Sequence, residues 1–176
     1  QVQRGGFGQG VHEGPLGQGR GEAARSRRPG EGAREGATAV FAPPSRRATL
    51  AGVQTIEHGD AGTPEIFKLM KQRGVALCPT VAAGDATSQY RGWRKGQEPE
   101  PERIQQKKQT VKAALQSGVE LAYGGDVGVF AHGDNLREAE LLVQEYGFTT
   151  LQTLRGLTAG NARIFQLPDR GRIQPG

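Results

Sequence analysis

Apolar and polar positions follow one another in short, regular units through the second part of the chain. Residues 52–58, GVQTIEH, are rich in β-branched side chains and short enough for a strand. Thr63 can then cap a helix with Pro64 at its first position, and Gly74 ends that helix. Residues 75–81, VALCPTV, are almost continuously apolar, which is typical of a strand buried on both faces of a parallel sheet.

The same units continue after a polar interruption. Residues 82–99 are predicted to form a loop, and loops of this length are more often functional than structural. Pro101 begins a helix with one apolar face, which Gly118 ends. Residues 119–123, VELAY, follow as a third strand.

Two further helices are predicted by capping-box patterns. Asn135 has Glu138 three positions later, and Thr149 has Gln152 in the same relation. The resulting order, β-α-β-α-β-α-α, indicates parallel strands joined by helical crossovers. The sequence therefore predicts an α/β fold.

The first 47 residues have a different composition. Eleven of the first 36 residues are glycine and large apolar side chains are rare, so this stretch buries too little surface to offset the entropy of ordering. We expect residues 1–47 to be a disordered or wrong-frame low-complexity segment, and residues 48–176 to be the folded body. Because residue 1 is Gln and the only methionine is Met70, we also expect the chain to be part of a longer protein.

Charge and composition narrow the classes of partner. The net charge is +5, but residues 1–50 hold 8 Lys and Arg against 4 Asp and Glu, while residues 51–176 hold 15 against 14. The predicted body is thus nearly neutral, which does not favour nucleic acid as its partner. No apolar run approaches the ~18 residues of a membrane span, and the single cysteine, Cys78, cannot form an internal disulfide. We expect a cytoplasmic protein without membrane contact.

His58 and Asp126 each follow a predicted strand. Since the carboxyl ends of parallel strands meet at one rim, where such folds assemble their sites, we expect both side chains there. They are 68 residues apart, close to the ~62 residues that two units of an eight-unit barrel span. An imidazole and a carboxylate suit a divalent metal such as zinc, and the carboxylate can also accept a proton from bound water. Taken alone, His58 could equally be a hydrogen-bonded strand-end residue and Asp126 a turn residue.

Four motifs carry a family resemblance: AGVQTIEHGD (51–60), LAYGGDVGVFAHGDN (121–135), LRGLTAGNARIFQL (154–167) and DRGRIQPG (169–176). Over residues 48–176 they resemble the C-terminal portion of the metal-dependent amidohydrolases, in the branch of imidazolonepropionase and the Xaa-Pro dipeptidases. The resemblance implies a partial (β/α)8 TIM barrel, about strands 6 to 8 with their helices. It also implies hydrolysis of an amide, cyclic amide or dipeptide C–N bond by metal-activated water.

The resemblance assigns roles to individual residues. His58 would be the strand-6 metal ligand, and Asp126 the strand-8 aspartate that touches the metal and acts as general base. His132 and Asn135 would line the substrate pocket, although this loop could instead be a turn that leads into a helix. The ligands that the family carries on strands 1, 4 and 5 are not visible in the sequence, and Phe41 stands about where the strand-5 histidine belongs.

The incomplete set of metal ligands bears on whether this chain is active alone. Two protein ligands fall short of the three that catalytic zinc usually has, so we expect the isolated chain to be inactive. We also expect it to associate with itself or with the missing half of the barrel. The alternative is a non-catalytic interaction protein, in which a basic Gly/Arg tail binds nucleic acid or a pseudo-enzyme body docks on an intact homologue.

Overall fold

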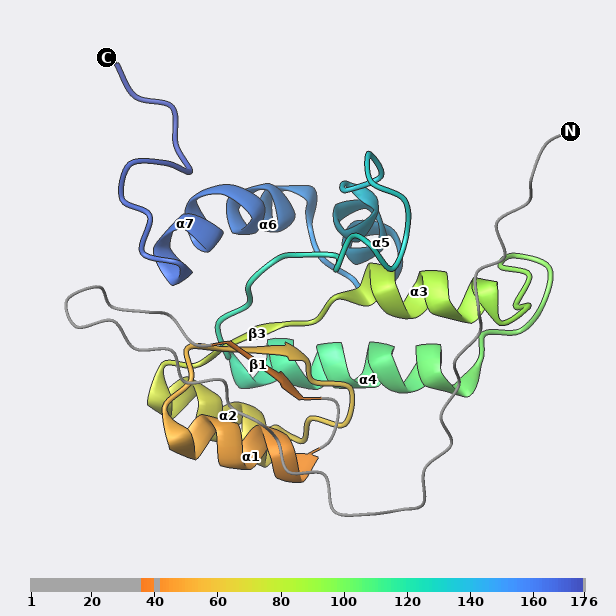
Figure 1. Ribbon diagram of the computed structural model, residues 1–176, viewed down its shortest axis with the longest axis horizontal. Helices are drawn as coiled ribbons and strands as arrows, with labels where there is room; N and C mark the ends of the chain where they lie inside the picture. The colour runs from red at the N-terminus through yellow and green to blue at the C-terminus, as the bar shows by residue number, and fades with distance from the viewer. Residues whose placement is uncertain (1–35, 40–41, 176) are drawn as a thin grey trace, which may run out of the picture.

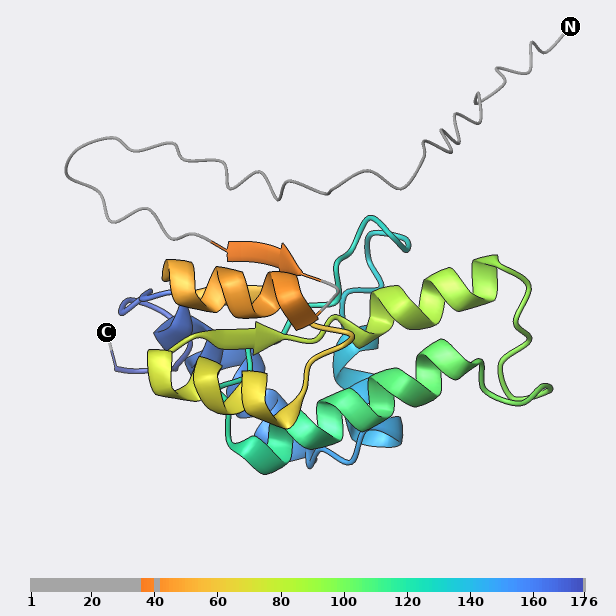
Figure 2. The ribbon, with the colours of Figure 1, turned by 90° about the horizontal axis from the view of Figure 1, so that it is seen from below.

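The computed structural model describes residues 36–39 and 42–175. In chain order the elements are β1 (Gly36–Ala39), α1 (Ala42–Ala51), β2 (Thr55–His58), α2 (Pro64–Arg73), β3 (Ala76–Cys78), α3 (Val81–Tyr90), α4 (Glu102–Ser117), α5 (Arg137–Glu145), α6 (Thr150–Arg155), the π-helical turn η1 (Gly156–Gly160) and α7 (Asn161–Ile164). The strands lie centrally, with α1 and α2 on one side and α6 and α7 on the other (Figures 1 and 2).

The sheet is parallel, in the order β1-β2-β3. Ile56 of β2 lies opposite Leu77 of β3. The segment after α4 adds one parallel bridge, between Leu77 and Leu121, in which Leu77 N donates to Glu120 O and Ala122 N donates to Leu77 O, both at 2.9 Å. The α/β class with parallel strands is therefore confirmed, but the predicted third strand is reduced to this bridge.

Among the residues that the structure describes, two apolar clusters form the core. The first packs the sheet against α2 and α4, and it contains Ile56, Phe67, Met70, Leu77 and Ala114. The second joins α3, α4 and α5, and it contains Val81, Ala86, Val111, Leu142 and Phe148. Cys78 is buried beside them, and burial raises the pKa of its thiol.

The predicted helix ends at four places are confirmed. The side chain of Thr63 accepts a hydrogen bond from Ile66 N at the start of α2. Gly74 and Gly118 end α2 and α4 with φ of 66° and 68°, a left-handed conformation that glycine adopts without a steric cost. At α6 the complete Thr149–Gln152 capping box is present.

The predicted loop over residues 82–99 is wrong in its first half, because α3 occupies Val81–Tyr90. Val81, Ala82 and Ala86 are buried in the second cluster. Small apolar residues can bury a helix face without the large side chains that make such a face obvious in a sequence. Val81 therefore begins a helix rather than ending a strand, and the irregular segment shrinks to residues 91–101.

Folded elements also precede residue 48, where the sequence predicts the body to begin. β1 pairs with β2, and α1 packs against both strands and against α2. Within α1, Thr49 Oγ1 donates to Ser45 O at 2.8 Å, and both side chains are buried. Residues 1–35 and Phe41 lie outside the described residues, so the expectations for them stay predictions.

The predicted Asn135–Glu138 capping box is wrong. Helix α5 has Leu136 at its N-cap, and Asn135 Oδ1 accepts from Gly133 N at 3.1 Å in the preceding turn. Since the side chain of Glu138 points to another helix, a local pattern has given way to a tertiary contact.

Glu138 instead caps the start of α3. Its carboxylate, 1% exposed, accepts from Val81 N at 3.1 Å and from Ala82 N at 2.7 Å. Burial raises the pKa of Glu138 to about 7, although the two N–H groups and Lys107 act in the opposite direction. Glu138 therefore connects α5 to the start of α3, directly after β3, through a carboxyl group that is shielded from solvent.

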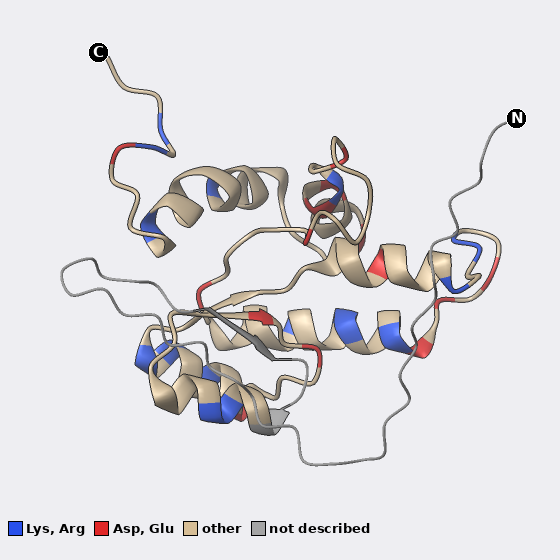
Figure 3. Ribbon diagram, in the orientation of Figure 1, with Lys and Arg blue, Asp and Glu red and all other residues tan. Residues whose placement is uncertain are grey.

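Charged residues are unevenly distributed over the elements. Lys and Arg residues lie on α1, α2 and α4 and in the segment after α3, while Asp and Glu residues lie mainly on α5 and in the loops (Figure 3). Within residues 36–39 and 42–175, no helix has the length and apolar character to cross a bilayer.

We predict that Glu138→Gln removes a pH dependence of stability. The pKa of Glu138 is about 7 in the folded chain against an ordinary value of 4.5, so its contribution is complete below about pH 4.5 and is lost as the pH rises through about 7. The measurement is the free energy of unfolding in urea at several pH values. The difference, wild type minus Glu138→Gln, should fall by about 3 kcal/mol across this range.

The exposed Glu140 on the same helix provides the control, because Glu140→Gln should leave the pH profile unchanged. A wild-type minus Glu138→Gln difference that rises with pH would contradict the prediction. It would mean that the two backbone N–H groups outweigh burial.

Two glycines in helices should respond oppositely to a methyl group. A Cβ at Gly156 would overlap the ring of Tyr123, which packs edge to face on Phe148, whereas a Cβ at Gly84 in α3 would meet open space. We predict that Gly156→Ala lowers the free energy of unfolding by about 2 kcal/mol, and that Gly84→Ala raises it by about 0.5–1 kcal/mol. Urea unfolding followed by circular dichroism measures both, and effects of equal sign would contradict this packing.

Candidate functional site

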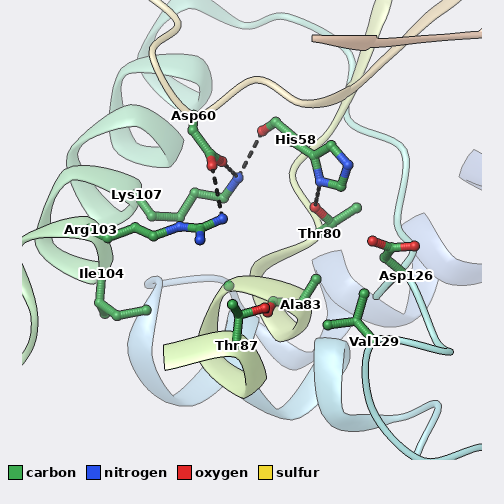
Figure 4. A pocket seen from close by; sticks show the side chains of 11 residues that line it. His58, Asp60, Thr80, Ala83, Thr87, Arg103, Ile104, Lys107, Asp126 and Val129 are labelled. Carbon is green, nitrogen blue, oxygen red and sulfur yellow. Dashed lines mark hydrogen bonds and ion pairs between the residues drawn. The ribbon is translucent and has the colours of Figure 1, made fainter. Parts of the chain in front are cut away.

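One pocket lies where β2, β3 and the segment after Leu121 end. It has a volume of about 110 Å³ (Figure 4). Its polar lining comprises His58, Asp60, Thr80, Arg103, Lys107 and Asp126, and α3 with Ile104 and Val129 supplies the apolar side. The structure thus brings His58 and Asp126 to one pocket, as the sequence predicts; their chemical roles stay predictions.

Left-handed backbone is concentrated at this pocket. His58, Thr80 and Asp126 have φ of 67°, 48° and 60°, and they are three of the four non-glycine residues with positive φ in the described part of the chain. Such conformations cost free energy for residues with a Cβ and cluster at functional sites in proteins. Each of the three turns the chain at the end of a parallel segment.

The imidazole of His58 is oriented by Thr80. His58 Nδ1 lies 2.7 Å from Thr80 Oγ1, and the Thr80 hydroxyl donates to Pro79 O at 2.8 Å. Because that hydroxyl has already donated its proton, it accepts from His58, so Nδ1 carries the hydrogen in the neutral ring. Nε2 then holds the lone pair, which is the form a metal or a proton requires.

Asp126 reaches the pocket because the residue before it is small. The Gly124–Gly125 pair precedes it, and a Cβ at Gly125 would lie 3.1 Å from Phe130 and 3.2 Å from Glu138. Asp126 itself is exposed, and its main-chain oxygen accepts from Val129 N at 3.2 Å. The glycine therefore lets this turn pack closely on α5 while the carboxylate faces the pocket (Figure 4).

Asp60, Lys107 and Arg103 are pocket residues that the sequence analysis missed. Lys107 Nζ donates to His58 O at 2.8 Å and forms an ion pair with Asp60, whose other oxygen lies 3.5 Å from Arg103 Nη2. Burial lowers the pKa of Lys107, and the Asp60 carboxylate opposes that shift. The available signal was the position of Lys107 in the apolar stripe of α4, three residues after Ile104 and four before Val111.

His132 and Asn135 are not among the residues that line this pocket. Both are exposed, in the loop between Asp126 and α5. Their contribution to a substrate pocket stays a prediction. The hydrogen bond between Asn135 and Gly133 agrees with the alternative, a turn that leads into α5.

The described residues do not complete a catalytic metal site. Within residues 36–39 and 42–175, no group of three or more His, Cys, Asp or Glu side chains is placed to hold a metal ion. His58 and Asp126 amount to two donors, and catalytic zinc usually has three protein ligands. Further donors would have to come from elsewhere.

Comparison with known families identifies the class of this chain. The sequence matches the model of the amidohydrolase family over residues 31–176. The chain therefore belongs to the amidohydrolase family, as its motifs indicate. A search of curated proteins finds no match.

Solved structures resemble this chain over part of their length. A Xaa-Pro dipeptidase with bound methionine in its active site is 30% identical, with a TM-score of 0.71 over 82% of this chain and 37% of its own. A prolidase complexed with N-methylphosphonate-L-proline is 23% identical, with a TM-score of 0.64 over 80% and 35%. Ochratoxinase of A. niger is 22% identical, with a TM-score of 0.67 over 80% and 33%, and these two show a shared fold alone. The chain thus spans about a third of the length of each.

Proposed function

We propose that this chain forms the C-terminal strands of a (β/α)8 barrel. In this assignment β2 is the sixth strand, β3 the seventh, and the segment bridged at Leu121 the eighth. β1 then takes the place of the fifth strand, because it precedes β2 and pairs with its other edge in parallel. Sequential parallel neighbours joined by helices are the connection pattern of such a barrel, and the share of each relative that this chain covers supports the assignment.

The proposed activity of the complete protein is hydrolysis of an amide, cyclic amide or dipeptide C–N bond. The observation that carries it is the meeting of His58 and Asp126, 68 residues apart, at one pocket at the strand ends. The similarity to a Xaa-Pro dipeptidase supports a dipeptide among these substrates. In the complete fold a divalent metal, zinc by the chemistry of the donors, would supply an activated water when bound.

Within that activity, this chain contributes two side chains. His58 presents Nε2 as a donor, with its ring held through Nδ1, and Asp126 presents an exposed carboxylate suited to accept a proton. We propose that the isolated chain is inactive, because His58 and Asp126 do not make a three-ligand site.

The same assignment implies a partner surface. Leu151 and Leu154 on α6 are 55% and 58% exposed, one helical turn apart, and β1 lies at an edge of the described sheet. Exposed apolar side chains and unpaired strand edges favour association. We propose that the missing part of the barrel covers them in the complete protein, and that the chain associates with itself when alone.

We predict that Asp126→Asn lowers kcat at least about a hundredfold in a full-length protein that carries this segment, because the proton acceptor is lost. The measurement is turnover of a dipeptide series with added zinc. Asp134→Asn, in the exposed loop that follows, is the matched control and should retain turnover. Wild-type turnover by Asp126→Asn would contradict the catalytic role of Asp126 and leave the fold assignment standing.

The second prediction concerns the chain alone, which should elute from size-exclusion chromatography as an oligomer and bind an apolar dye. The double variant Leu151→Lys, Leu154→Lys should shift the elution towards the monomer, because charge on α6 opposes apolar association. A monomer without dye binding in the unmodified chain would contradict the proposed surface.

A further inference from the structure

The left-handed turn that carries His58 needs stabilising contacts from outside the turn. His58 has φ of 67° and Gly59 a φ of 62°, and Gly59 N donates to Glu57 O at 3.0 Å within the turn. A residue with a Cβ readily leaves the left-handed region of φ and ψ unless contacts with its surroundings keep it there. If His58 relaxed to ordinary backbone, its imidazole would point away from the pocket.

Helix α4 supplies these stabilising contacts from across the pocket. Lys107, whose side chain is 6% exposed, donates to His58 O at 2.8 Å and pairs with the carboxylate of Asp60 two residues later. One turn further along α4, Thr110 Oγ1 donates to Asp60 O at 2.8 Å. The two α4 side chains therefore fix both ends of the segment from His58 to Asp60.

The imidazole ring is fixed separately, through Thr80. Lys107 thus sets the direction in which the His58 side chain leaves the backbone, and Thr80 sets the rotation of the ring. Together they hold the imidazole at the lining of the pocket, with Nδ1 turned to Thr80 and the His58 carbonyl turned to Lys107 (Figure 4).

A purely structural need does not explain an ammonium group at this place. Lys107 lies in the apolar stripe of α4 between Ile104 and Val111, which are 2% and 1% exposed. An apolar side chain of similar length would fill this stripe without desolvating a charge, and buried ion pairs are often no more stabilising than apolar replacements. What the ammonium adds is a directed hydrogen bond to the carbonyl of His58.

We propose that Lys107, held by Asp60, is a positioning residue that keeps His58 in its left-handed conformation with its imidazole aimed into the pocket. The proposal rests on the proposed function for what His58 does there. Its test uses neither metal nor substrate, so that this proposal and the proposed function can fail separately.

The test measures exchange of the His58 Nδ1 proton with water by NMR, at about pH 8, where an ordinary histidine is neutral. In Lys107→Met, exchange should be at least about tenfold faster than in wild type, because the hydrogen bond to Thr80 opens when the turn relaxes. Lys112→Met, an exposed lysine of the same helix, should match wild type. Thr80→Val removes the acceptor and gives the reference for complete loss of protection.

The amide N–H of Phe148, which donates to Leu142 O at 3.1 Å within the second apolar cluster, reports on the rest of the fold by its exchange rate. Wild-type exchange at His58 in a folded Lys107→Met would overturn the proposal, as would equal acceleration at His58 and at the Phe148 amide, which indicates general destabilisation. If Lys107→Met does not give the amide spectrum of a folded protein, the same exchange measurement on Asp60→Asn tests the proposal. Faster exchange at His58 alone in that variant supports the proposal, and wild-type exchange overturns it.

Discussion

Left-handed backbone at the ends of three parallel segments is the constraint on which the candidate site depends. His58, Thr80 and Asp126 all adopt it, at a cost of roughly 1–2 kcal/mol for each residue that has a Cβ. In this conformation the chain turns sharply at the rim instead of continuing along the strand. The three side chains therefore face a common pocket although they come from different parts of the sequence.

Each of the three turns is held by contacts from helices outside the sheet. Lys107 of α4 binds the carbonyl of His58. Glu138 of α5 accepts the N–H groups of the two residues that follow Thr80, and Gly125 lets the turn before Asp126 pack on Phe130 and the same Glu138. Helices α4 and α5 thus do more than cover the sheet, because their buried charged groups shape its rim.

Much of the architecture could be predicted from local patterns. The caps at Thr63, Gly74, Gly118 and Thr149 depend on neighbouring residues only, and the parallel order follows from the alternation of strands and helices. His58 and Asp126 could be found because each ends an apolar segment at the spacing of two barrel units.

The features that sequence reasoning missed depend on distant partners. The Asn135–Glu138 pattern is locally sound, but Glu138 gains two hydrogen bonds at α3 instead. Helix α3 escaped notice because its buried face is made of small residues that gain their contacts from α4 and α5. Lys107 donates to the carbonyl of His58, 49 residues earlier, and no local pattern encodes that pairing.

The most direct measurement of the central claim is the backbone conformation of the three rim residues in solution. In NMR spectra the intraresidue cross-peak between the amide proton and Hα is strong when φ is positive, because the two protons then lie close together. Gln166, with φ of 50° away from the pocket, is the internal reference. The account predicts cross-peaks at His58, Thr80 and Asp126 as strong as that of Gln166. Weak cross-peaks at these three residues beside a strong one at Gln166 would contradict it.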